Sequence, residues 1–360
     1  MNNSFNNTRS PRHATNAEPR DGAVTNQRTI LVTGASGFLG SRIAAQVAKR
    51  KQPVRTTGRS QVSRDQLPGY VQRDLTNEPL DDLVDGTSCV IHSAGLAHRH
   101  RKTSNDGDMF HDVNVEATER LAIAAANAGV EHFVLISSVS VYGECPPQPV
   151  TEDTQCYPTT PYAISKWEAE QRLKDVCKQS GMRATILRMA TLYGEGDPGN
   201  VGRLMSAIDR GRFIWIGTGA NQKSLLHGDD AAAAVLLAAA REAGSQVECY
   251  NVADKPVFMR DVVRGLADAL GTKVPRMRIP AGLVRGGLRA ATWFTPIKKK
   301  ATAWKSTIDK WLSDDVLDAT RFQQAFGFVS KTELREGLRR QVAEYRLSAN
   351  KTVSEIQEAA

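Results

Sequence analysis

The chain has 360 residues, of which 41% are hydrophobic and 24% charged, and it carries a formal net charge of +8. This composition is typical of a globular protein that can bury a large core, and no apolar run is long enough to span a bilayer. The five cysteines are scattered without a C-x-x-C pair, so neither a metal site nor a disulfide framework is predicted, and a cytoplasmic location is favoured.

Residues 1–28 are polar and lack the apolar core of a signal peptide, so we expect a disordered tail. The stretch "TILVT" at 29–33 predicts a strand, and Gly34, Gly37 and Gly40 separate it from an amphipathic run. Glycines there let backbone approach a pyrophosphate, while the helix start favours negative charge. The arrangement predicts dinucleotide binding, although any tight strand-to-helix turn would also select glycine.

Further strands are predicted at 53–59, 89–94, 132–138 and 184–189, with amphipathic helical patterns such as 115–129 between them. This alternation implies parallel strands joined by helical crossovers. The predicted fold class is therefore α/β, with a Rossmann-type doubly wound parallel sheet that binds NAD(P) at 29–190. Residues 191–348 turn to glycine-rich loops and short helices, which predicts mainly a smaller substrate-binding domain that can return elements to the sheet. We expect 349–360 to form a tail.

The second predicted strand ends in "TTGRS", where Gly58 takes the place of the acid that grips the ribose of NAD. Arg59 follows it and suits the 2′-phosphate of NADP. NADP is therefore favoured, NAD stays open, and a solvated surface arginine is the alternative reading. Asp74 falls where such sheets place a carboxylate near the adenine.

The segment "PYAISK" places Tyr162 and Lys166 one helical turn apart. A lysine ammonium beside a phenol favours the phenolate, so we expect Lys166 to lower the pKa of Tyr162 and to let it exchange protons near neutral pH. The preceding strand ends "ISSVSVYG", and its hydroxyls can bind the oxygen that Tyr162 protonates. A Ser–Tyr–Lys set is therefore predicted.

At this point the motifs "TGASGFLG", "IHSAGLAH", "ISSVSVYG" and "PYAISK" resemble the extended short-chain dehydrogenases of the NAD-dependent epimerase/dehydratase family, which mostly act on nucleotide sugars. The resemblance implies that Ser138, Tyr162 and Lys166 are catalytic. Together with the turn, it leads us to expect a cofactor site lined by Gly34, Ser36, Gly37, Phe38, Leu39, Gly40, Arg59, Asp74, Leu75, Ser93, Ala94, Gly95, Asn114, Tyr162 and Lys166.

The substrate end departs from the family pattern, because Thr191 replaces the usual asparagine and Lys223 the usual arginine beside the sugar diphosphate. Lysine meets phosphate as a point charge without a bidentate fork. We expect Thr191, Lys223, Asn200 and the basic-loop residue His98 near the substrate.

We therefore expect an NAD(P)-dependent nucleotide-sugar 4-epimerase or ketoreductase that transfers hydride with the Ser–Tyr–Lys set and serves polysaccharide synthesis. A dehydratase is disfavoured because Val139 and Ser140 beside the catalytic serine are not acids. A hydroxysteroid or flavonoid-type reductase and a non-catalytic NADP-sensing protein are the alternatives.

The segment 281–311 carries seven basic residues against one acid, without a nucleic-acid-binding signature. Its residues Trp304, Ile308 and Trp311 form an apolar stripe at helical spacing. This stripe either packs on the smaller domain or, with the lysines, brings 283–311 to the anionic inner face of a membrane. A homodimer is a further expectation.

Overall fold

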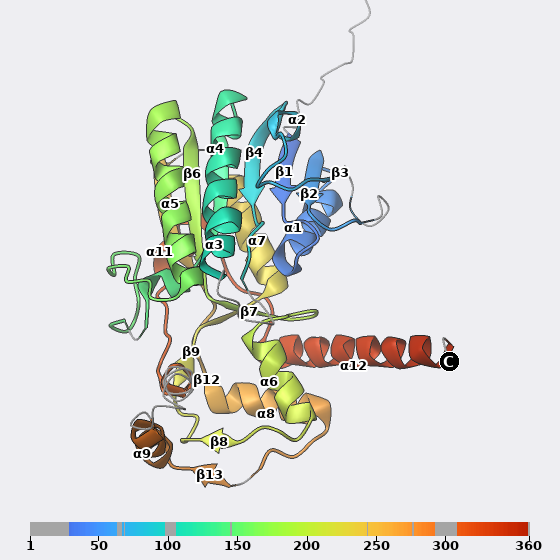
Figure 1. Ribbon diagram of the computed structural model, residues 1–360, viewed down its shortest axis with the longest axis vertical. Coiled ribbons are helices and arrows are strands. Elements are labelled where there is room, and N and C mark those ends of the chain that lie inside the picture. Colours follow the sequence, from blue (N-terminus) through green and yellow to red (C-terminus); the bar gives the residue numbers. More distant parts are fainter. Residues whose placement is uncertain are drawn as a thin grey trace, which may run out of the picture.

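The computed structural model describes residues 29–62, 67, 69–97, 106–144, 146–242, 244–275, 277–291 and 308–358. The predicted tail at 1–28 lies outside these residues. The other predicted tail, 349–360, is not a separate segment up to Glu358, because α12 (Leu334–Glu358) runs through it. This long helix extends sideways from the body of the molecule (Figure 1).

A seven-stranded parallel sheet forms the centre of the larger domain, with strand order β11-β6-β5-β4-β1-β2-β3. Its inner strands are near-continuous apolar runs because both faces are covered. The carboxyl ends of parallel strands meet at one edge, where ligands bind. The strands are β1 (Thr29–Thr33), β2 (Val54–Gly58), β3 (Tyr70–Gln72), β4 (Thr87–His92), β5 (His132–Ser138), β6 (Arg183–Met189) and β11 (Val247–Val252).

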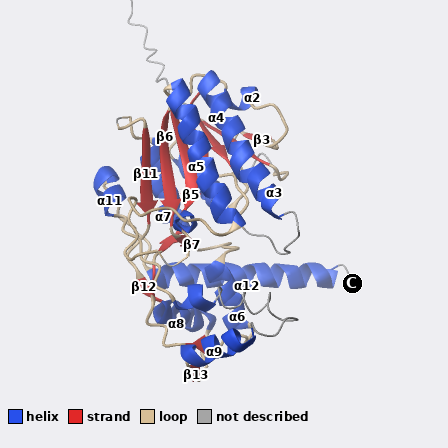
Figure 2. Cartoon of the chain, turned by 60° about the vertical axis from the view of Figure 1, so that its left-hand side comes forward, coloured by secondary structure: helices blue, strands red, loops and turns tan. Residues whose placement is uncertain are grey.

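Helices cover both faces of this sheet, and each face has its own core (Figures 1 and 2). On one side α1 (Phe38–Lys49) packs against α7 (Gly228–Ala239), with Ile43 and Leu226 in the core. On the other, α4 (Ala117–Asn127) packs against α5 (Pro161–Ser180), with Leu121 and Leu173 buried between them and the sheet. The shorter covering helices are α2 (Asp81–Val84), α3 (Asp106–His111) and α11 (Thr320–Phe326).

A smaller lobe lies beyond the carboxyl edge of the sheet and has a third core that includes Trp215, Val263 and Leu338 (Figure 1). Its strands are short and paired in twos rather than forming a second sheet of comparable size. The elements are β7 (Thr191–Tyr193), α6 (Asn200–Asp209), β8 (Trp215–Ile216), β9 (Gln222–Lys223), β10 (Leu225–His227), β12 (Val257–Phe258), α8 (Met259–Leu270), β13 (Arg278–Ile279) and α9 (Ala281–Ala291).

A charged cluster joins the two lobes at the start of α7. Arg340 of α12 bonds the carboxylates of Glu195 at 2.5 Å and of Asp229 at 2.6 Å. Arg42 of α1 reaches the same two acids, and the buried His227 lies 3.3 Å from Glu195. Arg42 and Arg340 therefore neutralise Glu195 and Asp229, two acids that without these arginines would resemble a cation-binding site.

Candidate active site

The turn after β1 can be built only with glycine. Gly34 has a φ of +67°, and a Cβ on it would lie 2.6 Å from the amide nitrogen of Ala94. A Cβ on Gly40 would lie 2.1 Å from the carbonyl oxygen of Gly34. The helix α1 therefore starts directly against the strand end. Its N-cap, Gly37, offers no side-chain cap, so the first-turn amides of Phe38 and Leu39 remain available to an anion.

The end of β2 carries a glycine in place of an acid, and two side-chain hydroxyls crowd the position. A Cβ on Gly58 would lie 2.9 Å from the Ser36 hydroxyl and 3.0 Å from that of Tyr70. Arg59 is exposed beside it and lies close enough to Asp74 to lower the pKa of that carboxyl slightly. Hydrogen bonds from Thr76 to Asp74 lower this pKa more strongly. These residues and the buried Leu75 fit the adenosine end of a dinucleotide.

The segment after β4 is tied to the glycine turn and to the catalytic helix. The amide of Ala94 donates to the Thr33 hydroxyl at 3.1 Å, and that hydroxyl bonds His92 at 2.8 Å. Burial, with a smaller effect of Lys166, lowers the pKa of His92 to about 3, so this imidazole is neutral. Ser93 and Ala94 thus lie against Gly34.

Asn114 occupies a π-helical turn, η1 (Asp112–Glu116), and holds three segments together. Its carboxamide oxygen accepts from the Leu96 amide at 2.7 Å, and its NH₂ donates to the Leu96 carbonyl at 3.0 Å and to the Ser165 hydroxyl at 2.9 Å. A Cβ on Gly95 would lie 3.1 Å from Asn114 and 3.8 Å from the ammonium of Lys166. A π-turn at this place is typical of functional sites.

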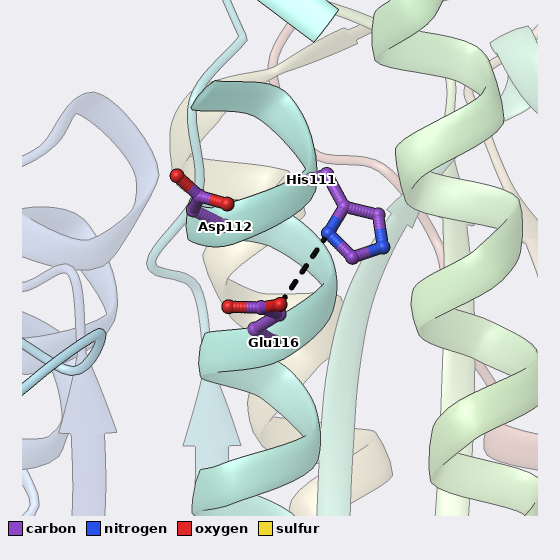
Figure 3. A group of neighbouring side chains, drawn as sticks. All are labelled: His111, Asp112 and Glu116. Carbon is purple, nitrogen blue, oxygen red and sulfur yellow. Dashed lines mark ion pairs between the residues drawn. The ribbon is translucent and has the colours of Figure 1, made fainter. Parts of the chain in front are cut away.

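The outer side of the same turn carries three partly or fully exposed ionisable groups, His111, Asp112 and Glu116 (Figure 3). His111 Nδ1 lies 3.8 Å from a Glu116 oxygen, and its other nitrogen lies 4.0 Å from Glu168 on α5. Exposed groups of this kind are common without a bound ion, so we do not count them as a metal site.

The helix α5, which carries Tyr162 and Lys166, begins at Pro161 and is capped by the Thr160 hydroxyl, which accepts from the Ala163 amide at 3.2 Å. Tyr162 is half-buried on its first turn, and its pKa is raised by burial and lowered less by a hydrogen bond with Ser138. The expectation of a lowered pKa for Tyr162 is therefore wrong for this structure, because burial outweighs the hydrogen bond. Burial also lowers the pKa of Lys166 to about 8.

Ser138 ends β5 and caps the short 3₁₀ turn η2 (Val139–Tyr142). Its hydroxyl lies 2.7 Å from that of Ser140 and accepts from the Ser140 amide at 3.2 Å. The ring of Phe110 meets the ring of Tyr162 edge-on at 6.0 Å. The structure thus brings Ser138, Tyr162 and Lys166 together, and adds Phe110, which has no distinctive sequence signal.

The predicted substrate residues that the structure describes lie in the smaller lobe or at its junction with the sheet. Thr191 is half-buried two residues beyond Met189, which pairs in register with Ser138, so it lies at the same sheet edge. Lys223 donates to the Lys310 carbonyl at 2.8 Å, and Asn200 accepts from Arg203 at 2.5 Å, both within the smaller lobe. His98 lies outside the described residues.

A tyrosine and a lysine beside a serine hydroxyl, at the edge of a sheet that starts with a glycine-built turn, define the class of extended short-chain dehydrogenases. The chain belongs to one family of this class, the NAD dependent epimerase/dehydratase family, whose model matches residues 30–253. Among the described residues, no helix combines the length and apolarity needed to cross a membrane.

Relatives of known name cover nearly the whole chain. It is 28% identical over 315 residues to the N-acetyl-alpha-D-glucosaminyl-diphospho-ditrans,octacis-undecaprenol 4-epimerase of Escherichia coli O157:H7, covering 86% of this chain and 93% of the relative. It is 26% identical to the UDP-glucose 4-epimerase of Vibrio cholerae, covering 90% and 97%. Among solved structures, MoeE5 in complex with UDP-glucose and NAD superposes with a TM-score of 0.71 at 26% identity, covering 89% and 99%.

Proposed function

We propose that this protein is an NAD(P)-dependent 4-epimerase of nucleotide-linked sugars that serves polysaccharide synthesis. The observation that carries the proposal is the meeting of the Ser138 and Tyr162 hydroxyls beside the buried Lys166. The names of two relatives, both 4-epimerases, and the UDP-glucose bound by MoeE5 support the position of reaction and the substrate class.

In this proposal each catalytic side chain has one task. NAD(P), when bound, accepts or returns a hydride at a sugar carbon. Tyr162 takes the proton from the hydroxyl on that carbon and returns it later. Ser138 donates a hydrogen bond to the same oxygen and keeps it in place. Lys166 supplies the positive charge that stabilises the Tyr162 phenolate, which matters because burial alone opposes that phenolate.

We assign NADP as the preferred cofactor. Gly58 stands in place of the ribose-binding acid of NAD-specific sites, while the Ser36 hydroxyl beside it and the exposed Arg59 can meet a 2′-phosphate. Arginine suits this task because its fork can bond two phosphate oxygens at once. In this arrangement Asp74 lies near the adenine of the bound cofactor. Lys223, Asn200 and Thr191 are assigned to the sugar diphosphate.

The test separates epimerisation from net reduction. The purified protein is incubated with UDP-glucose or UDP-N-acetylglucosamine and catalytic NAD(P), and the C4 epimer is followed by proton NMR. Inversion without net consumption of NAD(P)H is expected. Stoichiometric NAD(P)H oxidation with a 4-keto sugar would instead identify a ketoreductase. Thermal stabilisation by steroids but not by UDP-sugars would contradict the proposed substrate class.

We also propose that the far end of the smaller lobe contacts an anionic membrane surface at the cytoplasmic face. Arg278 of β13 pairs in register with Trp215 of β8. Met277 therefore directly precedes β13, and Ile214 directly precedes β8. These two side chains are 75% and 57% exposed, and Leu283 on α9 is 70% exposed. The segments 210–223 and 271–290 contain basic residues and no acid. Exposed apolar groups among cations fit such a surface.

Part of the basic segment packs inward. Trp311 is partly buried and packs against the smaller lobe's core, with its ring 6.3 Å from that of Phe213. The residues Trp304 and Lys298 to Lys300 lie outside the described part of the chain.

A homodimer is proposed through α4 and α5, where Ile123 and Ile164 are 45% and 39% exposed. Light scattering of the purified protein tests it.

A further inference from the structure

A buried ion pair lies one turn beyond the catalytic lysine. On α5, Tyr162, Lys166 and Glu170 follow one another at intervals of four residues and so share one helix face. The Glu170 side chain is 0% exposed and that of Arg188 is 4% exposed. Arg188 Nη2 donates to Glu170 Oε2 at 2.7 Å, and Arg188 Nε donates to Oε1 at 3.1 Å. The pair is therefore bidentate and shielded from solvent.

The ion pair is bonded to the strand that carries the catalytic serine. Ser137 donates to Glu170 Oε1 at 2.5 Å and is the chain neighbour of Ser138. Arg188 pairs in register with Ser137 across β5 and β6. One carboxylate thus receives donors from both strands at the same level of the sheet. This fixes α5, and with it Tyr162, relative to Ser138.

The arginine is held from its other side as well. Its Nη1 donates to the Tyr142 hydroxyl at 3.0 Å, and its guanidinium lies over the rings of Tyr142 and Trp167 at 4.9 and 5.5 Å. Tyr142 donates in turn to Asn251 at 2.8 Å. The network therefore connects η2, β6, β11 and α5, and it leaves Arg188 little freedom to move away from Glu170.

The charges around Lys166 are few in the described structure. Glu170 raises the pKa of Lys166, against the larger lowering effect of burial. From β4, His92 faces Lys166 and is neutral. Two uncharged residues also lie near Lys166, namely Asn114 of η1 and Gly95 of the segment after β4. Arg188 holds the same carboxylate with two hydrogen bonds.

We propose that Glu170, held by Arg188 and Ser137, is a positioning residue that keeps Lys166 charged and in line with Tyr162. It touches neither substrate nor cofactor and acts only through Lys166 and the helix that carries it. The catalytic part of this inference rests on the proposed function. The electrostatic part concerns Lys166 itself and is independent of it.

The test uses two variants that are expected to shift the pKa of Lys166 in opposite directions. Glu170→Gln removes the attraction on Lys166, so its pKa should fall, by about one unit for a neighbouring charge. Arg188→Met removes the cation paired with Glu170, so the pKa of Lys166 should rise, but by less than Glu170→Gln lowers it, because Glu170 is the charge with the larger effect on Lys166. The pKa is read from the ¹³Cε resonance of Lys166 during a pH titration, and the resonance is assigned by its loss in Lys166→Met.

Folding needs its own control, because breaking a buried pair is strongly destabilising whereas replacing both partners is often neutral. The double variant Glu170→Gln/Arg188→Met removes both charges and should keep the native melting behaviour with a lowered pKa of Lys166. Glu170→Asp should restore part of the wild-type value. An unchanged pKa in the double variant, or shifts of equal sign in the two folded single variants, would overturn the proposal.

The pH profile of kcat/KM gives the catalytic readout. In the double variant its alkaline limb, where Lys166 loses its proton, should move to lower pH in step with the NMR value. A wild-type protein without epimerase activity would refute the proposed function but leave the NMR test intact. A shifted Lys166 pKa with an unmoved alkaline limb would overturn the catalytic part alone.

Discussion

The Cα of Gly40 faces the carbonyl oxygen of Gly34 so closely that a Cβ would stand 2.1 Å from it, a separation that no real pair of such atoms shows. The atom in the way is backbone, so it cannot rotate aside. The first turn of α1 must therefore move if any side chain is added. The glycine spacing read from the sequence thus has a steric cause within the turn, in addition to any contact with a ligand.

Gly40→Ala should lower the free energy of unfolding by roughly 1–3 kcal/mol, typical of overpacking. It should also weaken NADP binding, because the first-turn amides move with the helix. Urea unfolding and calorimetric titration measure the two effects. Gly107→Ala is the control, since a Cβ there meets nothing within 4 Å. Equal behaviour of the two variants would contradict the packing argument.

Tyr162→Phe should reduce the rate of epimerisation by about 10²- to 10⁴-fold, because the proton transfer is lost, while NADP affinity stays nearly unchanged. Steady-state kinetics and fluorescence titration separate these effects. Tyr157→Phe serves as the control, as that ring is 69% exposed. Full activity in Tyr162→Phe would remove the residue from the mechanism.

Arg59→Ala should weaken NADP by about 1.5–3 kcal/mol, the value of a hydrogen bond to a charged group, and leave NAD unchanged. Dissociation constants for both cofactors test this. Arg50→Ala, another exposed arginine, should alter neither. If NADP and NAD weaken equally, Arg59 does not read the 2′-phosphate.

Stability should fall on mild acidification. Burial lowers the pKa of His92 to about 3 and that of His132 to about 4, both from 6.5. The unfolded chain therefore binds more protons than the folded one below pH 6.5, so stability decreases as the pH falls, by about 1.4 kcal/mol per unit for each histidine. Urea titrations between pH 7 and 5 measure the slope. His132→Gln should reduce it, and a slope unchanged in this variant would contradict the assignment.

The protein should sediment with vesicles that contain anionic lipid and be released by salt, since each basic residue near such a surface contributes about 1 kcal/mol. Met277→Ser together with Arg278→Glu should weaken this binding. Val329→Ser, 74% exposed but outside the proposed surface, is the matched control. Sedimentation that is indifferent to lipid charge would argue against a membrane contact.

The sequence predicted the architecture well where local pattern determines it. The strands expected at 29–33 and 132–138 have the observed bounds, and those at 53–59, 89–94 and 184–189 overlap β2, β4 and β6 closely. Apolar runs and glycine turns are short-range signals, so they can be recognised without knowledge of tertiary contacts. The same holds for the tyrosine and lysine four residues apart on α5.

Features that depend on distant contacts were missed. Glu170 and Arg188 are 18 residues apart and meet only because the register of β5 and β6 brings Arg188 beside Ser137. The sign of the pKa shift of Tyr162 was wrong because the sequence shows a neighbouring lysine but not the burial of the site. The two-residue strands of the smaller lobe carry too few residues for a periodic signal.

The position of β11 has a consequence for how the chain must be made. This strand comes from the second half of the sequence, yet it pairs with β6 over its whole length, from Val247 opposite Ala184 to Val252 opposite Met189. During synthesis β6 therefore emerges long before its outer neighbour and presents an open row of amides and carbonyls. Such an edge invites pairing with other nascent chains. A fragment ending near residue 190 is therefore expected to aggregate through the open edge of β6.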